Sequence, residues 1–309
     1  MGNYIIKRLL SMIPILFGIS FLSFTLINLS PSDPAEVALR VNEITPTEEA
    51  VAQMRTELGL DKSFVERYAA WVVNSLQGDF GNSYITNKPV ISEMGQAIPA
   101  TLHLALVSLS IILTVSITAA VLCTVYEGTI VDRLIRGAVF VSEAIPSFWI
   151  GLLLMWLFAV KLNLLPTSGM ETPVSVILPA VTLSLAYIST YVRLLRNNMV
   201  NNKLENYVLY AKARGLKERK IFEHIFKNSL QSSIAALGMS IPKLIAGTVV
   251  VENIFAWPGV GRLCITAIFN HDYPIIQAYV LLMAVLFVGF NLLVDIITML
   301  LDPRLRKEA

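Results

Sequence analysis

The 309-residue sequence is short of charge, because only 15% of its residues are Asp, Glu, Lys or Arg, against about 25% in an ordinary soluble domain. Hydrophobic residues make up 55% of the chain and the mean hydropathy is +0.65. This balance predicts a membrane protein. The formal net charge of +2 is small, whereas a duplex-binding surface needs clustered Lys and Arg to replace phosphate counterions. We therefore expect no nucleic-acid partner.

The motifs of metal and nucleotide sites are also missing. The two cysteines, Cys123 and Cys264, show no CxxC or zinc-ligand spacing, so we expect both to be packing residues. The three histidines stand alone, outside any HExxH pattern, and no GxxxxGK[ST] loop is present to hold nucleotide phosphates. These absences predict a chain with no metal site, no cofactor of its own and no ATP hydrolysis.

Six apolar runs are long enough to cross a bilayer as helices. About 20 residues at 1.5 Å rise span the roughly 30 Å hydrocarbon core, and backbone groups without water must pair within each run. The first run is longer than the 7 to 15 residues of a signal-peptide core, so we expect a retained span. The sequence thus predicts an all-α integral membrane protein, a single transmembrane domain over residues 1–309, with spans at 9–29, 104–126, 138–160, 173–192, 229–251 and 274–294.

The distribution of Lys and Arg predicts the orientation of these spans. With the N-terminus inside, the inner segments hold sixteen basic residues and the outer segments seven. Basic residues near span ends favour the cytoplasmic side. Both termini of this multi-pass membrane protein are therefore predicted to lie in the cytoplasm.

The outer segment 30–100 is long and rich in acidic residues, with ten Asp and Glu against five Lys and Arg. The stretches "PTEEAVAQMRTELGL" and "FVERYAAWVVNSL" have helical patterns, and "GDFGNSYITNKPV" contains turn residues. We expect a small extracytoplasmic cap that offers a docking surface to an external partner, since long loops in compact proteins usually carry function. The alternative is a plain connecting loop.

The inner segment 193–228 contains the charged stretch "YVLYAKARGLKERKIFEHIFKN". Its pattern predicts one short helix through Asn206–Arg214 and a second from Leu216 into Phe226. Gly215 lies at the corner, because glycine adopts positive φ without steric cost. One interpretation is a basic loop that binds anionic lipid headgroups. The other is an amphipathic elbow that docks in a groove of a cytoplasmic partner.

"YAKARGLKERKIFEHI" resembles the EAA loop of ATP-binding-cassette importer permeases, whose helix pair docks on the ATPase subunit. Ala211, Gly215 and Ile225 match the family pattern, whereas Leu209 and Tyr210 replace its first Glu and Ala, and Lys227 and Asn228 replace its final Leu and Pro. The resemblance implies an ATPase-coupling set of Tyr210, Ala211, Arg214, Gly215, Leu216 and Ile225.

Further stretches along nearly the whole chain are similar to the dipeptide, oligopeptide and nickel permeases, among them "ILPAVTLSLAYISTYVRLLRNNM", "VVENIFAWPGVGR" and "LDPRLR". Within that group, "ENIFAWPGVGRL" and "LPTSG" look most like permeases for nickel or for metal bound to opine-type chelators. The resemblance implies a second homologous permease subunit, two ATPase subunits that bind ATP and Mg, and an extracytoplasmic binding protein. A peptide cargo is the alternative.

Charged residues and prolines inside the runs are candidates for the translocation path or its gates. Charge at bilayer depth is expensive and usually faces a cavity or a partner, and proline frees backbone carbonyls and bends helices. The candidates are Glu143, Pro146, Pro242, Lys243 and Glu252, with Pro179 and Asp295 as further possibilities. The alternative is structural pairing. We also expect an external amphipathic helix over 260–269 near the path's mouth, or a surface connector.

Two other classes remain open on the residues alone. An ion-coupled secondary transporter would use Glu143, Lys243 and Asp295 as a relay, but the inverted repeats typical of such folds are not evident, because the outer segment 30–100 has no counterpart in the second half. An intramembrane enzyme would need a paired nucleophile and base, and none stands out.

Overall fold

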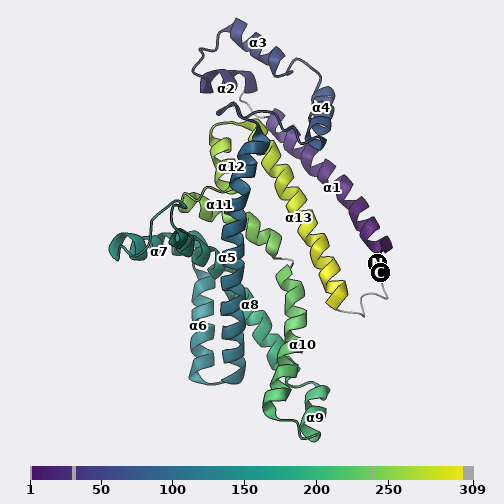
Figure 1. Ribbon diagram of the computed structural model, residues 1–309, viewed down its shortest axis with the longest axis vertical. Helices are drawn as coiled ribbons and strands as arrows, with labels where there is room; N and C mark the ends of the chain where they lie inside the picture. The colour runs from purple at the N-terminus through teal and green to yellow at the C-terminus, as the bar shows by residue number, and fades with distance from the viewer. Residues whose placement is uncertain (1, 30–32, 239, 302–309) are drawn as a thin grey trace. The chain divides into compact units, whose positions relative to one another are not determined.

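A computed structural model describes residues 2–29, 33–238 and 240–301 (Figure 1). The chain separates into two compact units: the first comprises residues 1–101 and 258–289, and the second 102–257 and 290–309. The described residues form no β-strand, only an isolated bridge between Asn82 and Pro89. The helices are α1 (Gly2–Asn28), α2 (Pro34–Val41), α3 (Glu48–Glu57), α4 (Phe64–Leu76), α5 (Val90–Val125), α6 (Ile130–Ala144), α7 (Ser147–Leu154), α8 (Ile177–Asn202), α9 (Asn206–Ala213), α10 (Glu218–Gly238), α11 (Ile241–Ile254), α12 (Val260–Phe269) and α13 (Tyr273–Leu301).

In the first unit, three short helices between α1 and α5 begin at capping residues that the sequence supplies. The side chains of Asp33 and Thr47 accept backbone N–H bonds at the starts of α2 and α3. Ser63 and Glu66 form a reciprocal capping box at the start of α4. Such caps satisfy N–H groups that have no partner inside the helix. The helical patterns read over residues 46–60 and 64–76 are thus confirmed as α3 and α4.

Aromatic side chains attach α4 to the end of α1. Phe24 lies 5.4 Å from the rings of both Phe64 and Tyr68, in edge-to-face geometry, and the Tyr68 hydroxyl is 2.8 Å from Ser20 Oγ. Edge-to-face pairs of this kind contribute about 0.5–1.5 kcal/mol beyond the area they bury. Helix α4 therefore has a fixed attachment to the first long helix.

Helix α5 begins at Val90, inside the expected outer segment 30–100, and continues through most of the expected span 104–126. Val90, Met94 and Ala97 form a buried stripe at helical spacing. Val90 and Met94 pack with residues of α12 and α13, including Ala267 and Ile275. Burial of this face outweighs the helix-breaking tendency of Pro99 within α5. The expected helix over 260–269 is confirmed as α12.

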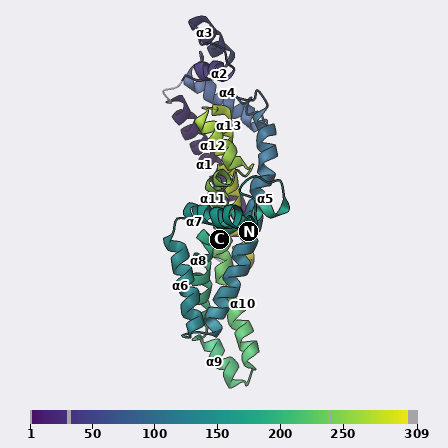
Figure 2. The ribbon, with the colours of Figure 1, turned by 90° about the vertical axis from the view of Figure 1, so that its left-hand side faces the viewer.

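In the second unit, α6 runs beside α5 and α8 (Figures 1 and 2). The expected span 138–160 is not one straight helix, because α6 ends at Ala144 and α7 leaves at an angle of 102°. Pro146 lies at this corner, where its ring and missing N–H prevent the helix from continuing. A π-helix (Met155–Lys161) follows α7, and a 3-10 turn (Pro173–Val176) leads into α8.

Four described helices are long and apolar enough to cross a membrane, and five candidates result if the bent α6–α7 pair counts as one span. The expected run 229–251 is divided between α10 and α11, with its residue 239 outside the described residues. Within the described residues, the structure thus gives an all-helical membrane protein with four or five candidate spans.

Candidate functional site

The corner between α9 and α10 is a helix C-terminus closed by a left-handed glycine. Gly215 has φ of +73°. The N–H of Leu216 donates to the carbonyl of Ala211 at 3.1 Å, and the N–H of Gly215 donates to that of Lys212 at 2.9 Å. This pair of bonds defines a Schellman motif, in which glycine is favoured because it has no Cβ. The helix–glycine–helix pattern is thus confirmed, and we call residues 206–226 the elbow.

The elbow is anchored by a buried apolar cluster. Ile221 and Ile225, one turn apart on α10, are buried with Met199 of α8 and Ala120 of α5. Ala211 and Leu216 pack against the same cluster, which is the apolar contact that accompanies a Schellman motif. Full burial of one Ile side chain contributes about 1.5–3 kcal/mol. Ile225 therefore positions α10 from inside the protein.

Polar side chains add a second connection between α8 and α10. Asn198 Nδ2 donates to Ser233 Oγ and Asn202 Nδ2 donates to Ser229 Oγ, both at 3.1 Å. The Tyr207 hydroxyl donates to Asn202 Oδ1 at 3.0 Å. Ser229 and Ser233 are buried, so these bonds fix the register of the two helices, since a buried polar group left unpaired costs about 1–3 kcal/mol.

The outer surface of the elbow is apolar at its tip and basic around it. Tyr210 is 73% exposed and Leu209 is 64% exposed, while Arg214 and Gly215 are also exposed. The family pattern included Tyr210 in the predicted ATPase-coupling set but not Leu209. Leu209 becomes a candidate contact residue only when the structure shows that this apolar side chain is exposed. The exposed Lys220 holds the pKa of Glu223 below its usual value through a 2.8 Å hydrogen bond.

Among the charged candidates in the apolar runs, Glu143 has a structural partner. Its carboxylate lies 2.5 Å from the guanidinium of Arg193, which joins the end of α6 to α8. Lys243 is exposed on α11, and Glu252 is fully buried near the end of the same helix. Because Arg193 compensates the charge of Glu143, this contact supports structural pairing as the alternative to a place in the translocation path.

The prolines proposed as bends occupy three different positions. Pro146 is at the 102° corner between α6 and α7. Pro242 is the second residue of α11, where its missing N–H removes no intrahelical bond. Pro179 lies in the first turn of α8 and is buried. Only Pro146 is therefore placed at a measured bend of the chain.

A buried ion pair that sequence reasoning missed connects α6 to α8. Asp132 is 1% exposed and accepts two hydrogen bonds from Arg196, each of 3.1 Å. Arg136 lies 3.2 Å from the same carboxylate, and the N–H of Gly128 donates to it at 3.2 Å. The fork geometry of Arg matches a carboxylate well. Asp132 and Arg196 are 64 positions apart, so no local signal in the sequence links them.

A second buried carboxylate holds the loop between α4 and α5. Asp272, just before α13, accepts hydrogen bonds from Ser83 Oγ at 2.5 Å and from the N–H of Tyr84 at 3.2 Å. Both Asp272 and Ser83 are buried. Burial raises the pKa of Asp272, although the bond from Ser83 opposes this change. The loop after α4 is thereby fixed to the turn between α12 and α13.

No group of three or more His, Cys, Asp or Glu residues able to hold a metal ion occurs in the described part of the chain. The described residues thus form an all-helical membrane protein with a helical elbow between α9 and α10. A sequence model described as the binding-protein-dependent transport system inner membrane component matches residues 112–307, and the model of its N-terminal region matches residues 1–105. The chain belongs to this family, and it is a transport component rather than an enzyme.

Relatives match the chain over its full length. The metal-staphylopine import system permease protein CntB of Staphylococcus aureus (strain NCTC 8325 / PS 47) is 41% identical, with 100% of both chains covered. The oligopeptide transport system permease protein AppB of Bacillus subtilis (strain 168) is 37% identical, with 99% of both chains covered. A solved structure of the MetNI methionine ABC transporter gives a TM-score of 0.56 at 15% identity, covering 68% of this chain and 96% of that one. The last similarity supports the permease fold alone.

Proposed function

We propose that this ATP-binding-cassette importer permease forms half of a translocation pathway for nickel or for a metal bound to a small chelator. The observation that carries this proposal is the full-length 41% identity to a permease named for metal-staphylopine import. A peptide cargo is the second candidate, favoured by the similarity to an oligopeptide permease.

The proposed arrangement has six spans and both termini in the cytoplasm. The excess of basic residues on the inner segments supports this orientation. Residues 193–228 then form the cytoplasmic coupling loop and residues 30–100 the extracytoplasmic cap. Glu143, Pro146, Pro242, Lys243 and Glu252 remain our candidates for the path and its gates, and the chain itself binds no cofactor.

The elbow is proposed to dock in a groove of a partner ATPase, which binds ATP and Mg. An exposed apolar tip at Leu209 and Tyr210, surrounded by basic residues, has the amphipathic character that helix-in-groove recognition needs. Within this proposal Tyr210 and Arg214 make direct contacts, whereas Ala211, Leu216 and Ile225 support the corner at Gly215. A second homologous permease and a second ATPase complete the transporter in the membrane.

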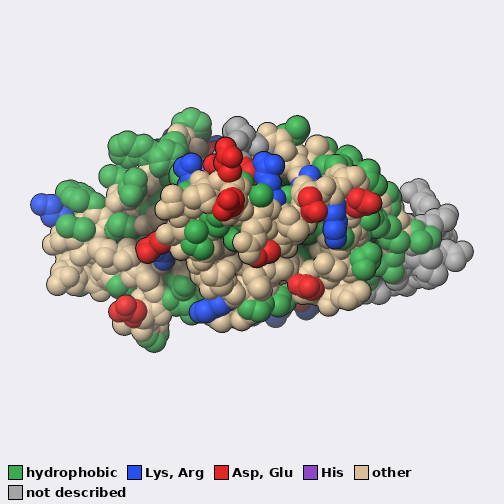
Figure 3. Space-filling model, turned by 90° about the horizontal axis from the view of Figure 1, so that it is seen from above, with side chains coloured by type: hydrophobic (Ala, Val, Ile, Leu, Met, Phe, Trp, Pro, Cys, Tyr) green, Lys and Arg blue, Asp and Glu red, His purple; other side chains and the backbone are tan. Residues whose placement is uncertain are grey.

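The cap is proposed to receive the loaded extracytoplasmic binding protein. The face drawn in Figure 3 carries acidic and basic side chains near one another. Interspersed charges of both signs allow complementary pairing, which sets orientation and association rate more than affinity. Docking of the binding protein on the cap and ATP-driven closure of the ATPases on the elbow would then bias the same equilibrium between inward-open and outward-open conformations.

The cargo is tested by uptake of radioactive nickel into cells that express the whole transporter with its own binding protein. Uptake should require a metal-chelating opine or histidine and should ignore excess dipeptide. Entry of labelled dipeptide without nickel uptake would reject the metal proposal and assign peptides as the cargo.

The coupling role is tested with Leu209→Ser, compared with Leu164→Ser in the loop after the π-helix, where Leu164 is also strongly exposed. Leu209→Ser and Gly215→Glu should each uncouple ATP hydrolysis from uptake while the protein still inserts in the membrane. Leu164→Ser should leave hydrolysis coupled to uptake. Normal uptake with Gly215→Glu would contradict the role of the elbow.

A further inference from the structure

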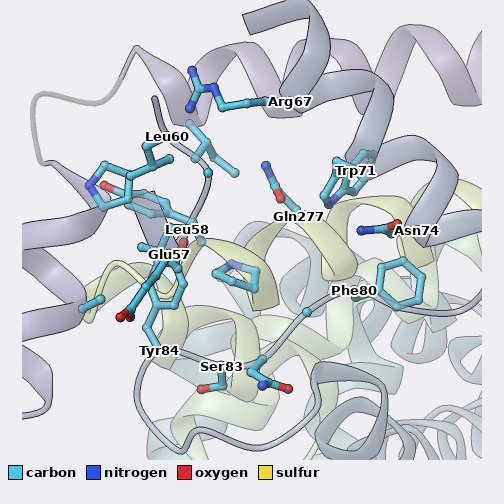
Figure 4. Close-up of a pocket in the computed structure, with 18 of the residues that line it drawn as sticks. Glu57, Leu58, Leu60, Arg67, Trp71, Asn74, Phe80, Ser83, Tyr84 and Gln277 are labelled. Carbon is cyan, nitrogen blue, oxygen red and sulfur yellow. The ribbon is translucent and has the colours of Figure 1, made fainter. Parts of the chain in front are cut away.

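The first unit contains a cavity of about 570 Å³ that the proposed transport cycle does not use. It lies among α1, the three short helices α2–α4, the loop after α4 and the beginning of α13 (Figure 4). Sites for small molecules occupy about 300–1,000 Å³ and combine apolar walls with a few fixed polar groups. The size of this cavity therefore suits a small molecule.

One wall of the cavity is a single face of α4. Arg67, Trp71 and Asn74 line it at positions i, i+4 and i+7, which share a face of a helix. The Ser63–Glu66 capping box fixes the start of this helix, and the ring of Trp71 packs 6.2 Å from that of Phe24 on α1. The wall is thus held in place before any ligand arrives, which lowers the entropic cost of binding.

Two hydrogen-bond donors on this wall have no acceptor. Nε of Arg67 and Nε1 of Trp71 are buried and lack a hydrogen-bond partner in the described part of the chain. Figure 4 draws Gln277 of α13 beside Trp71 and below Arg67. Most buried polar atoms in proteins are paired, so two exceptions on one face of a helix indicate a wall prepared for acceptors.

The two acidic residues that line the cavity do not accept hydrogen bonds from Arg67 Nε or Trp71 Nε1 and have other hydrogen-bond donors. Glu57 accepts a hydrogen bond from Gln53 at 3.2 Å, and Asp79 accepts the N–H of Gly81 at 2.9 Å. The rest of the lining is largely apolar and aromatic, including Phe80, Tyr84 and Tyr273. The cavity therefore combines unpaired donors with aromatic surface.

We propose that this cavity binds a small molecule that carries a carboxylate on an apolar body. The carboxylate accepts a hydrogen bond from Arg67 Nε, a charged donor that suits an anionic oxygen, and Trp71 Nε1 donates to a second polar oxygen of the molecule. The apolar body lies against Phe80. The proposal concerns a binding site and does not depend on the identity of the transported cargo.

The test compares an acid with its matched neutral amide. The full chain is reconstituted in lipid nanodiscs and titrated calorimetrically with N-acetyl-L-phenylalanine and with N-acetyl-L-phenylalaninamide, which differ only in the carboxylate. The acid should bind at least about tenfold more tightly, a difference of about 1.4 kcal/mol. Equal binding of the two compounds, or no binding of the acid, would overturn the proposal.

Variants then locate the site. Arg67→Gln should weaken binding of the acid by about tenfold or more and leave binding of the amide unchanged. Trp71→Phe keeps an aromatic ring, removes the N–H and should weaken binding of the acid by a smaller factor. Arg40→Gln is the control, because Arg40 is exposed on α2 and does not line the cavity. Wild-type affinity in a folded Arg67→Gln protein would refute the assignment. The assay involves neither ATP nor metal, so it can fail while the proposed transport function stands.

Discussion

The ion pair between Asp132 and Arg196 gives the sharpest test of how the second unit is held together. Asp132 is 1% exposed and the Arg196 side chain is 16% exposed, so solvent screens their interaction little. Asp132→Ala leaves the Arg196 guanidinium partly buried without the carboxylate that accepts two of its hydrogen bonds. Breaking a buried pair by removing one partner costs about 3–5 kcal/mol, because the remaining charge is uncompensated.

The measurement is the thermal unfolding midpoint of the purified protein in detergent. At about 2 °C per kcal/mol for a chain of this size, Asp132→Ala should lower the midpoint by roughly 6–10 °C. The control is Glu36→Ala, which removes the exposed pair between Glu36 and Arg40 on α2. Exposed pairs contribute about 0–1 kcal/mol, so the control should shift the midpoint by about 2 °C or less.

The double variant Asp132→Leu with Arg196→Met distinguishes two causes of a lower midpoint in Asp132→Ala: an uncompensated buried charge and a loss of packing at this position. Apolar replacement of both partners is often neutral or stabilising, so this variant should recover most of the lost midpoint. A loss in Asp132→Ala no larger than that of the Glu36→Ala control would refute the reasoning. A double variant as unstable as Asp132→Ala would show instead that the packing of this position, and not the charge, is decisive.

Three further outcomes follow from single contacts. A Cβ added at Gly151 would lie 2.8 Å from Thr182 Cγ2, so Gly151→Ala should destabilise by about 1–3 kcal/mol, and adding Thr182→Ser, which removes that methyl, should restore the melting midpoint. Gly215 has φ of +73° with open space around it, so Gly215→Asn should be tolerated and Gly215→Val should cost about 1–2 kcal/mol and expose the elbow to protease. Burial raises the pKa of Asp272. The stability that this carboxyl contributes is therefore complete below about pH 4 and is lost as pH rises through the raised pKa. Asp272→Asn should remove this contribution from the pH dependence of the melting midpoint, and an unchanged pH profile would contradict the prediction.

Local features of this fold could be predicted because their causes are local. The corner at Gly215 needs only a glycine after a short helix, and α12 follows from the turn at Pro258 and Gly259 and the apolar spacing after it. The approximate positions of α3 and α4 follow from helical patterns, and the structure adds the capping residues. Each of these depends on residues within about one or two helical turns, which a single sequence displays.

Features that depend on contacts between distant residues could not be predicted from the sequence. Pro146 marked a break, but the 102° turn of α7 depends on where α7 packs, since α7 contacts α8 and α11. The Asp132–Arg196 pair joins residues 64 positions apart. Ile225 matched a family pattern associated with coupling, but only its burial against Met199 separates a supporting role from direct contact. The donors of Arg67 and Trp71 look ordinary until the structure shows them without acceptors.

The connections of α8 explain why the elbow suits a coupling role better than a lipid-binding loop. α10 continues without interruption from Glu218 to Gly238, a rod of about 31 Å, and its buried serines bond to Asn198 and Asn202 of α8. α8 is in turn joined to α6 by the Asp132–Arg196 pair. A displacement of the elbow would therefore reach the start of α6 through directional contacts, and the 102° bend lies at the other end of that helix. A loop that only bound lipid headgroups would not need buried, register-specific contacts of this kind, because surface charge alone suffices for that attraction.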